Sequence, residues 1–195
     1  MKLPNQNMTD EELVKGCVEG KSKFQQAFYY KFSAVMKGVC IRYSDTIEEA
    51  EDILQDGFIK VFLNLKNFRL DGSLEGWVRR IMVNTALNYY RAKQKSSYHA
   101  NIDEIVEIVE DARIDNFDKL NAKVLLKMIE ELPPGYRIVF NMFEIEGYSH
   151  KEIADELGIS VNTSKSQLLK ARRALQHKII ELNEYENFKI ENNNR

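Results

Sequence analysis

The chain of 195 residues has 44% hydrophobic residues and a formal net charge of −2, from 28 lysines and arginines against 30 aspartates and glutamates. This size and apolar content are enough for one large or two small packed domains. No run approaches the ~18 uncharged apolar residues of a membrane span, and the polar opening segment lacks the apolar core of a secretory signal, so we expect a cytoplasmic protein without membrane insertion.

Helical periodicity runs through most of the chain. Apolar residues recur at three- and four-residue spacing, as in Ala50, Ile53, Leu54, Phe58 and Val61, which is the pattern of amphipathic helices. No hairpin dipeptide joins two alternating runs, so a sheet is not expected. The sequence predicts an all-α fold with helices near 9–18, 22–43, 46–66, 74–94, 118–131, 135–145, 149–157 and 161–182.

The two cysteines, Cys17 and Cys40, both fall in apolar helical patterns. Neither a CxxC pair nor a cluster of histidines accompanies them, which argues against a disulfide framework or a zinc site. The sequence therefore predicts two buried thiols, no metal and no cofactor.

Acidic residues crowd the helix expected at 46–66. Asp52, Gln55 and Asp56 have the i, i+3, i+4 spacing that places them on one side of this helix, opposite Leu54 and Phe58. Such a face is usually only solvated. This one could also present a polar patch to a protein partner.

A basic and aromatic stretch follows at 76–95. It holds five basic residues and no acid, interleaved with Trp77, Tyr89 and Tyr90 and the amides of Asn84 and Asn88. Basic groups track phosphates, while aromatic and amide groups suit unpaired bases. Helical core packing is the simpler explanation for Trp77 and the tyrosines.

An acidic segment lies between two blocks of the chain that are more basic than it is. Residues 94–118 carry seven acids and two basic residues. Charge asymmetry of this kind bears on partner choice, and the segment is typical of a linker between two domains. We expect domains at 1–94 and 119–182, a linker at 95–118 and a disordered polar tail at 183–195.

The segment from Tyr148 to Leu175 predicts a helix-turn-helix. Ser149 is a good N-cap for the first helix, and Glu152 completes a capping box. Gly158 can take the left-handed conformation that ends this helix, and Ser160 can cap the next helix after a short turn. The expected core residues of the motif are Ile153, Leu157, Ile159, Leu168, Ala171 and Leu175.

The second helix of this motif is depleted of acids. From Val161 to Lys178 there are five basic residues and no acid, which suits the phosphate-lined major groove of DNA. The alternative is a helical hairpin with a solvated basic face. We expect base-edge contacts from side chains away from the apolar stripe, and phosphate contacts from two arginines. The base-edge candidates are Lys165, Ser166, Gln167 and Lys170, and the phosphate-binding candidates are Arg172 and Arg173.

Two long segments together resemble a bacterial sigma factor of the extracytoplasmic-function group. AEDILQDGFIKVFLNLKNFRLDGSLEGWVRRIMVNTALNYYR is similar to the second region of that family. LPPGYRIVFNMFEIEGYSHKEIADELGISVNTSKSQLLKARRAL is similar to its fourth region. The order and spacing of the two segments make the resemblance far more specific than a lone helix-turn-helix.

The resemblance implies a promoter-specificity subunit of RNA polymerase that directs the core enzyme to promoters and promotes DNA melting. Asp52, Gln55 and Asp56 match the part of the second region that grips the clamp coiled coil of the β′ subunit. The implied partners also include the β flap, double- and single-stranded promoter DNA, and an anti-sigma factor. The acidic 95–118 stretch occupies the place of the family's linker, which passes through the cleft of the core enzyme toward the RNA exit path.

The resemblance also implies DNA-binding positions in both regions. The loop from Phe68 to Ser73 matches the loop that captures a base flipped from the −10 element. The chain departs from common family patterns at Ser164, where a hydrophobic residue is usual, and at Lys165 and Gln167, where arginine is frequent. The implied −10 positions are Phe68, Arg69, Asp71, Ser73, Trp77, Arg80, Asn84, Asn88 and Arg91. The implied −35 positions are Thr163, Lys165, Ser166, Gln167, Leu169, Lys170, Arg172 and Arg173.

Two other classes of protein are weighed against this one. A conventional helix-turn-helix repressor or activator would bind duplex operator without polymerase, and would leave the acidic patch and the 76–95 stretch without a function. An enzyme is disfavoured, because His99, His150 and His177 are scattered and neither a nucleophile motif nor a phosphate loop is present. We expect His150 to be an exposed residue of the first helix in the motif.

Overall fold

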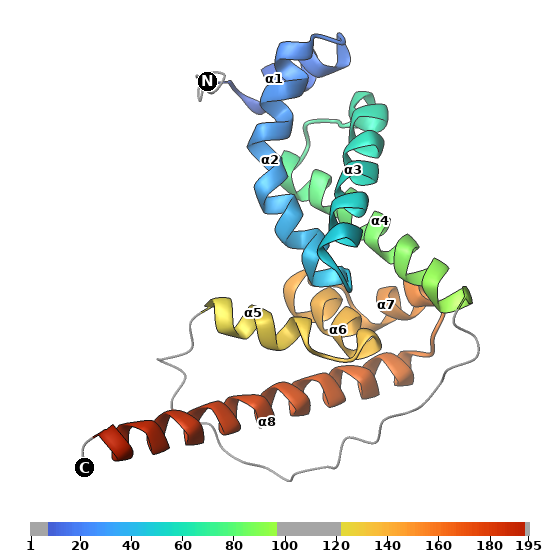
Figure 1. Ribbon diagram of the computed structural model, residues 1–195. Helices are drawn as coiled ribbons and strands as arrows, with labels where there is room; N and C mark the ends of the chain where they lie inside the picture. The colour runs from blue at the N-terminus through green and yellow to red at the C-terminus, as the bar shows by residue number, and fades with distance from the viewer. Residues whose placement is uncertain (1–7, 97–121, 194–195) are drawn as a thin grey trace. The chain divides into compact units, whose positions relative to one another are not determined.

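The computed structural model describes residues 8–96 and 122–193, and every regular element in these two ranges is helical. The predicted all-α class is therefore confirmed. The chain divides into two compact units, Met1–Ser97 and Tyr98–Arg195 (Figure 1). Most of the expected linker, from residue 97 onward, lies outside the described residues.

The first unit contains a short helix and three longer ones. Two capping side chains start helices here: Thr9 forms a capping box with Glu12, and the Thr46 hydroxyl accepts a hydrogen bond from the Glu49 amide. Its elements are α1 (Asp10–Val18), α2 (Ser22–Tyr43), α3 (Ile47–Asn64), the 3-10 turn η1 (Leu65–Asn67) and α4 (Leu74–Ser96).

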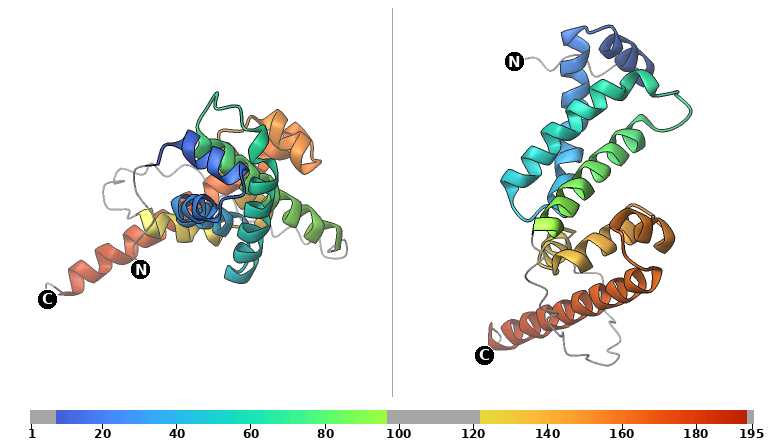
Figure 2. Two further views of the ribbon diagram at one scale, coloured as in Figure 1. Left: turned by 90° about the horizontal axis from the view of Figure 1, so that it is seen from above. Right: turned by 90° about the vertical axis from the view of Figure 1, so that its right-hand side faces the viewer.

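The core of the first unit lies between α2, α3 and α4, which pack against one another in all three pairings (Figure 2). Gly57 of α3 is part of this packing, since a Cβ atom there would lie 2.2 Å from the Sδ atom of Met82 on α4. The two helices therefore approach closely at a residue without a side chain. The fully buried side chains of this core include Phe28, Met36, Ile53, Leu65, Met82 and Leu87.

Both cysteines are buried and free, as the sequence predicted. Burial raises the pKa of the Cys17 thiol to about 11 and that of Cys40 to about 12, because a thiolate is poorly solvated in an apolar environment. Neither group is therefore a reactive thiolate near neutral pH.

The second unit is built on one long helix. The expected helix at 135–145 divides into α6 and a π-helical turn, and the expected helix at 118–131 is described only from residue 122. The elements are α5 (Ala122–Glu130), α6 (Pro134–Phe140), the π turn η2 (Asn141–Ile145), α7 (His150–Leu157) and α8 (Val161–Asn193).

An apolar stripe of α8 forms the core of this unit with α5 and neighbouring side chains, namely Met128, Ile129, Leu132, Ala171, Leu175 and Ile179. Of the core residues expected for the helix-turn-helix, Ile153, Leu168, Ala171 and Leu175 are buried, whereas Leu157 and Ile159 are only half-buried. None of the helices in the described ranges combines the length and apolar character that crossing a bilayer requires.

The end of α8 corrects one expectation. We expected a disordered tail from residue 183, but the helix continues to Asn193. The segment is polar, but it contains neither the proline nor the glycine that would stop a helix. Polarity alone therefore does not end α8.

Two glycines in helix interiors provide a test of the packing in the first unit. Gly57→Ala should destabilise the protein by about 1–3 kcal/mol, because the new methyl group would overlap Met82. Gly38→Ala in α2 is the matched control: a Cβ atom there meets open space, so the change should stabilise by roughly 0.5–1 kcal/mol. Urea unfolding of both variants measures the difference, and equal stabilities would contradict this account of the α3–α4 contact.

Candidate nucleic-acid interface

Three caps fix the geometry of the helix-turn-helix: one at the start of α7, one at its end and one at the start of α8. The Ser149 amide donates to the Glu152 carboxylate at 2.8 Å, and the Glu152 amide donates to the Ser149 hydroxyl at 3.3 Å. Gly158 has φ +67°, the left-handed conformation that ends α7, and Ser160 accepts from the Thr163 amide at 2.9 Å at the start of α8. The predicted capping box, glycine stop and second cap are all confirmed.

The candidate DNA-reading residues of α8 are mostly exposed. Leu169 is 48% exposed although it is apolar, and an exposed aliphatic side chain on such a helix can contact a thymine methyl group. The exposed set is Lys165, Ser166, Leu169, Lys170, Arg172 and Arg173, and Thr163 and Gln167 are half-buried.

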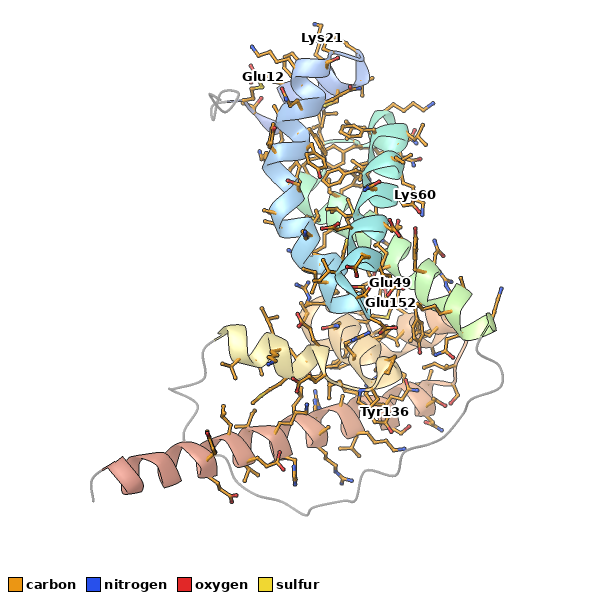
Figure 3. The ribbon with its side chains drawn as sticks, viewed as in Figure 1. Glu12, Lys21, Glu49, Lys60, Tyr136 and Glu152 are labelled. Carbon is orange, nitrogen blue, oxygen red and sulfur yellow. The ribbon has the colours of Figure 1, made fainter. Side chains whose placement is uncertain are left out.

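Two of these side chains lie toward α6. The amide of Gln167 lies so close to Gly135 that a Cβ atom there would be 3.3 Å from its Nε2 atom. The Lys170 ammonium lies over the ring of Tyr136, 5.7 Å from the centroid, and Tyr136 is labelled in Figure 3. We expected both residues to lie away from the apolar stripe. Gln167 instead contributes to the contact between α8 and α6.

The two arginines differ in their surroundings. Arg172 donates from Nε to the Glu144 carboxylate at 2.8 Å and from Nη2 to the same oxygen at 2.5 Å, and its guanidinium lies over the Phe143 ring. Arg173 is exposed, and no ion pair joins it to another described residue. Arg173 is therefore the more available cation for a phosphate.

His150 corrects a second expectation. It is half-buried: its ring stacks on Phe143 at a centroid distance of 4.5 Å, and its Nδ1 atom lies 2.9 Å from the Ser164 hydroxyl. Its pKa is lowered by partial desolvation first, and then by the positive charges of Lys165 and Arg172. One signal in the sequence could have indicated this contact. Ser164 is a polar residue at a position that belongs, by its spacing from Leu168 and Ala171, to the buried stripe of the helix.

In the first unit, the candidate single-strand-binding residues share one face of α4. Trp77 is half-buried and packs on Phe68 with ring centroids 5.4 Å apart, so it belongs partly to the core. The Arg91 guanidinium donates to the Asn88 side chain at 2.7 Å. The residues spaced by three or four positions along this face are Trp77, Arg80, Asn84, Asn88 and Arg91.

The loop that precedes α4 contains a strained residue. Leu70 has φ +59°, the one positive φ of a non-glycine residue among those described, a conformation that costs roughly 1–2 kcal/mol for an L-residue. Arg69, Asp71 and Ser73 are exposed around it. Strain of this kind is concentrated at functional sites, and it gives no signal in the sequence.

The candidate polymerase-binding face of α3 is partly polar and partly apolar. Asp52 and Gln55 are exposed, and further along the same side Ile59 is 58% and Leu63 69% exposed. Sequence reasoning missed these two, although they lie four and eight positions after Gln55, which continues one helical face. Exposed aliphatic side chains beside polar ones are typical of an interface with a protein.

Asp56 has a different position from Asp52 and Gln55. Its carboxylate accepts a hydrogen bond from the Tyr89 hydroxyl of α4 at 2.7 Å. This bond, together with desolvation, raises the pKa of Tyr89 to about 12. Asp56 therefore ties α3 to α4. Two residues of α3 labelled in Figure 3 also bond to α4: Glu49 accepts from Lys93, and Lys60 donates to the Thr85 hydroxyl.

Comparison with known proteins identifies the family to which both units belong. Residues 28–96 match the family described as Sigma-70 region 2, and residues 122–175 match Sigma-70, region 4. The chain is 28% identical over 185 residues to the ECF RNA polymerase sigma-E factor of Escherichia coli (strain K12), covering 90% of this chain and 96% of that protein. It is 27% identical over 177 residues to the RNA polymerase sigma-H factor of Pseudomonas aeruginosa, covering 85% and 91%.

Among solved structures, that of CnrH in complex with the cytosolic domain of CnrY covers 88% of this chain and 97% of its own, with 19% sequence identity and a TM-score of 0.48. That of the sigma factor RpoE in complex with the anti-sigma factor NepR from Bartonella quintana covers 76% and 92%, with 21% identity and a TM-score of 0.47.

A helix-turn-helix whose second helix carries no acid between Val161 and Lys178, together with a separate unit that has its own basic and aromatic face, defines a DNA-binding transcription factor. The chain belongs to the sigma-70 family of RNA polymerase sigma factors and to its extracytoplasmic-function (ECF) group. It acts in transcription initiation, where it binds RNA polymerase and directs it to promoters. The family that the sequence resemblance implied is thereby confirmed.

The pairing of Arg172 leads to a prediction about the salt dependence of promoter binding. Arg173→Ala should weaken binding to all sequences alike and reduce the slope of log affinity against log salt by about 1, because one phosphate contact is lost. Arg172→Ala should change this slope less, since Glu144 already neutralises its charge. Filter binding of polymerase carrying each variant, at several salt concentrations, measures the slopes. Equal changes would contradict the distinction between the two arginines.

Proposed function

We propose that the two units contact a promoter at two separate places while α3 holds the polymerase. The observation that carries the proposal is the placement of three faces of different chemistry on one chain. These are the exposed face of α8 between Val161 and Lys178, which carries no acid, the basic and aromatic face of α4, and the polar and aliphatic face of α3. The functional boundaries that we assign are 1–94 for the first domain, 95–118 for the linker and 119–182 for the second.

The second domain, in this proposal, reads the −35 element as duplex DNA. The start of α8 enters the major groove, where Lys165 reaches guanine acceptors and Leu169 contacts thymine methyl groups. Arg173 binds a phosphate and sets the register without specifying sequence. Lys170 reads a base after its ammonium leaves the ring of Tyr136, a weak contact at an exposed site.

The first domain, in this proposal, binds the −10 element as a separated strand. Arg80 and Arg91 follow the phosphates, while Asn84, Asn88 and the edge of Trp77 face unpaired bases. The loop around Leu70 receives a base flipped from the stack, so binding energy favours the melted state. The chain itself would perform no covalent catalysis, and its task requires neither a metal nor a cofactor.

We assign the binding of core polymerase to α3. Asp52 and Gln55 supply polar contacts to the clamp coiled coil of β′, and Ile59 and Leu63 supply the apolar contact area. By the same family relation, the second domain contacts the β flap and an anti-sigma factor holds the chain in the resting state. The place of action is the cytoplasm, where core polymerase and the chromosome are found.

Transcript mapping with core polymerase tests the proposed function. The full chain is mixed with bacterial core polymerase and a library of promoter fragments, and the 5′ ends of the transcripts are mapped. We expect co-elution with core and start sites that share −35 and −10 sequences. A conventional repressor or activator would bind duplex operator without polymerase, and that result without specific starts would contradict the proposal.

The α3 assignment has a sharper test. Asp52→Arg should reduce affinity for core polymerase on the order of tenfold or more, because it reverses a charge on that face. Glu11→Arg on α1 changes the net charge equally and should leave the affinity unchanged. Affinity is measured by titrating labelled chain with core enzyme, with circular dichroism to check the fold. Unchanged binding of a folded Asp52→Arg variant would remove this face from the interface.

A further inference from the structure

A buried serine lies inside the recognition helix. Ser164 is fully buried, and its hydroxyl lies 2.9 Å from Nδ1 of His150, the first residue of α7. A buried hydroxyl without a partner costs roughly 1–3 kcal/mol. His150 therefore satisfies a polar group that α8 buries against α7.

The contact of His150 continues through neighbouring rings and returns to α8. The imidazole stacks on Phe143 at an interplanar angle of 24°, and the guanidinium of Arg172 also lies over Phe143, 5.8 Å from its centroid. Glu144 holds that guanidinium through two hydrogen bonds. This set of contacts begins at Ser164 and ends at Arg172, two helical turns further along α8. It therefore holds this part of α8 against α7 and η2.

The candidate DNA-reading side chains lie on the turns that these contacts hold. Lys165 follows Ser164 directly, and Leu169 lies between Ser164 and Arg172 on the exposed side. A hydrogen bond is directional, whereas apolar packing alone permits small rotations of a helix about its axis. Contacts to base edges require placement within about 0.5 Å.

We propose that His150 is a positioning residue for −35 recognition, in which the imidazole fixes the rotation of α8 through its hydrogen bond to Ser164. The inference rests on the proposed −35 function of the second domain. His150 does not itself need to touch DNA. Its role is to hold the presentation of Lys165 and Leu169.

The charges around His150 favour its neutral form. Lys165 and Arg172 of α8 face it with positive charge, the first turn of α7 adds the positive end of the helix dipole, and the acid beside it, Glu144, is already paired with Arg172. Below about pH 6.5 the unfolded chain takes up a proton at this residue that the folded unit resists. The His150 contribution to stability therefore decreases as the pH falls through that value.

Four variants test the proposal in the full chain bound to core polymerase. They are His150→Phe, which keeps the stacked ring but leaves Ser164 unpaired, Ser164→Ala, the double variant, and His150→Gln, which keeps a hydrogen-bonding group that does not titrate. The readout is the ratio of affinities for two promoter fragments that differ only in an intact or a scrambled −35 element. Circular dichroism and affinity for core polymerase serve as controls for folding.

We expect His150→Phe, Ser164→Ala and the double variant each to reduce this ratio roughly tenfold, because all three remove the same directional hydrogen bond, so the losses should not add. The ratio for His150→Gln should remain near the wild-type value, because its amide can still bond the Ser164 hydroxyl, which also covers the case in which His150→Phe does not fold.

Other outcomes would overturn the inference. A folded double variant that recovers the wild-type ratio, or a folded His150→Phe variant that keeps it, would show that the hydrogen bond of His150 does not position α8. If the wild-type polymerase complex does not distinguish the two fragments at neutral pH, the proposed −35 function itself fails. That result differs from loss in the variants alone, so the two failures are distinguishable.

Discussion

The second unit depends on the division of α8 into two faces. One face carries the apolar stripe of Leu168, Ala171, Leu175 and Ile179, whose burial holds α8 in the unit. The other carries five basic residues and no acid between Val161 and Lys178. Acids on neighbouring elements then decide which cations remain available: Glu144 pairs with Arg172 and Glu131 with Lys178, at 2.6 Å for the second pair. Lys165 and Arg173 are left facing solvent.

The first unit separates its charges in the same way. Acidic residues of α3, and Asp45 just before it, accept hydrogen bonds from side chains on one side of α4. Asp56 accepts from Tyr89, and Asp45 and Glu49 both accept from Lys93. Exposed ion pairs contribute little individually, but here they keep the acids away from the opposite side of α4. A polyanion can then approach that side of α4, which carries no acid from Gly76 to Ser96, while Asp52 belongs to the face assigned to the polymerase.

The sequence predicted those features that local chemistry decides. The capping box at Ser149 and the stop at Gly158 follow from backbone groups within a few residues, so the helix-turn-helix was found at nearly its observed bounds. The strain at Leu70 and the turning of Gln167 toward Gly135 depend on packing between elements, which periodicity does not encode. The continuation of α8 was missed because composition was read as disorder, although nothing in the tail breaks a helix.

The polar contact between Ser164 and His150 is the least predictable feature and has the clearest physical meaning. A hydrophobic residue at position 164 would contribute burial without direction, and a small core tolerates many arrangements of such residues. A buried hydrogen bond costs desolvation, but it is satisfied in one geometry only, so it favours a unique packing of the elements that share it. In the role proposed for α8, which places side chains on base edges, a fixed rotation matters more than stability, since exchanging a paired polar contact for an apolar one can be nearly neutral. The serine therefore fits a reader whose specificity depends on position more than on stability.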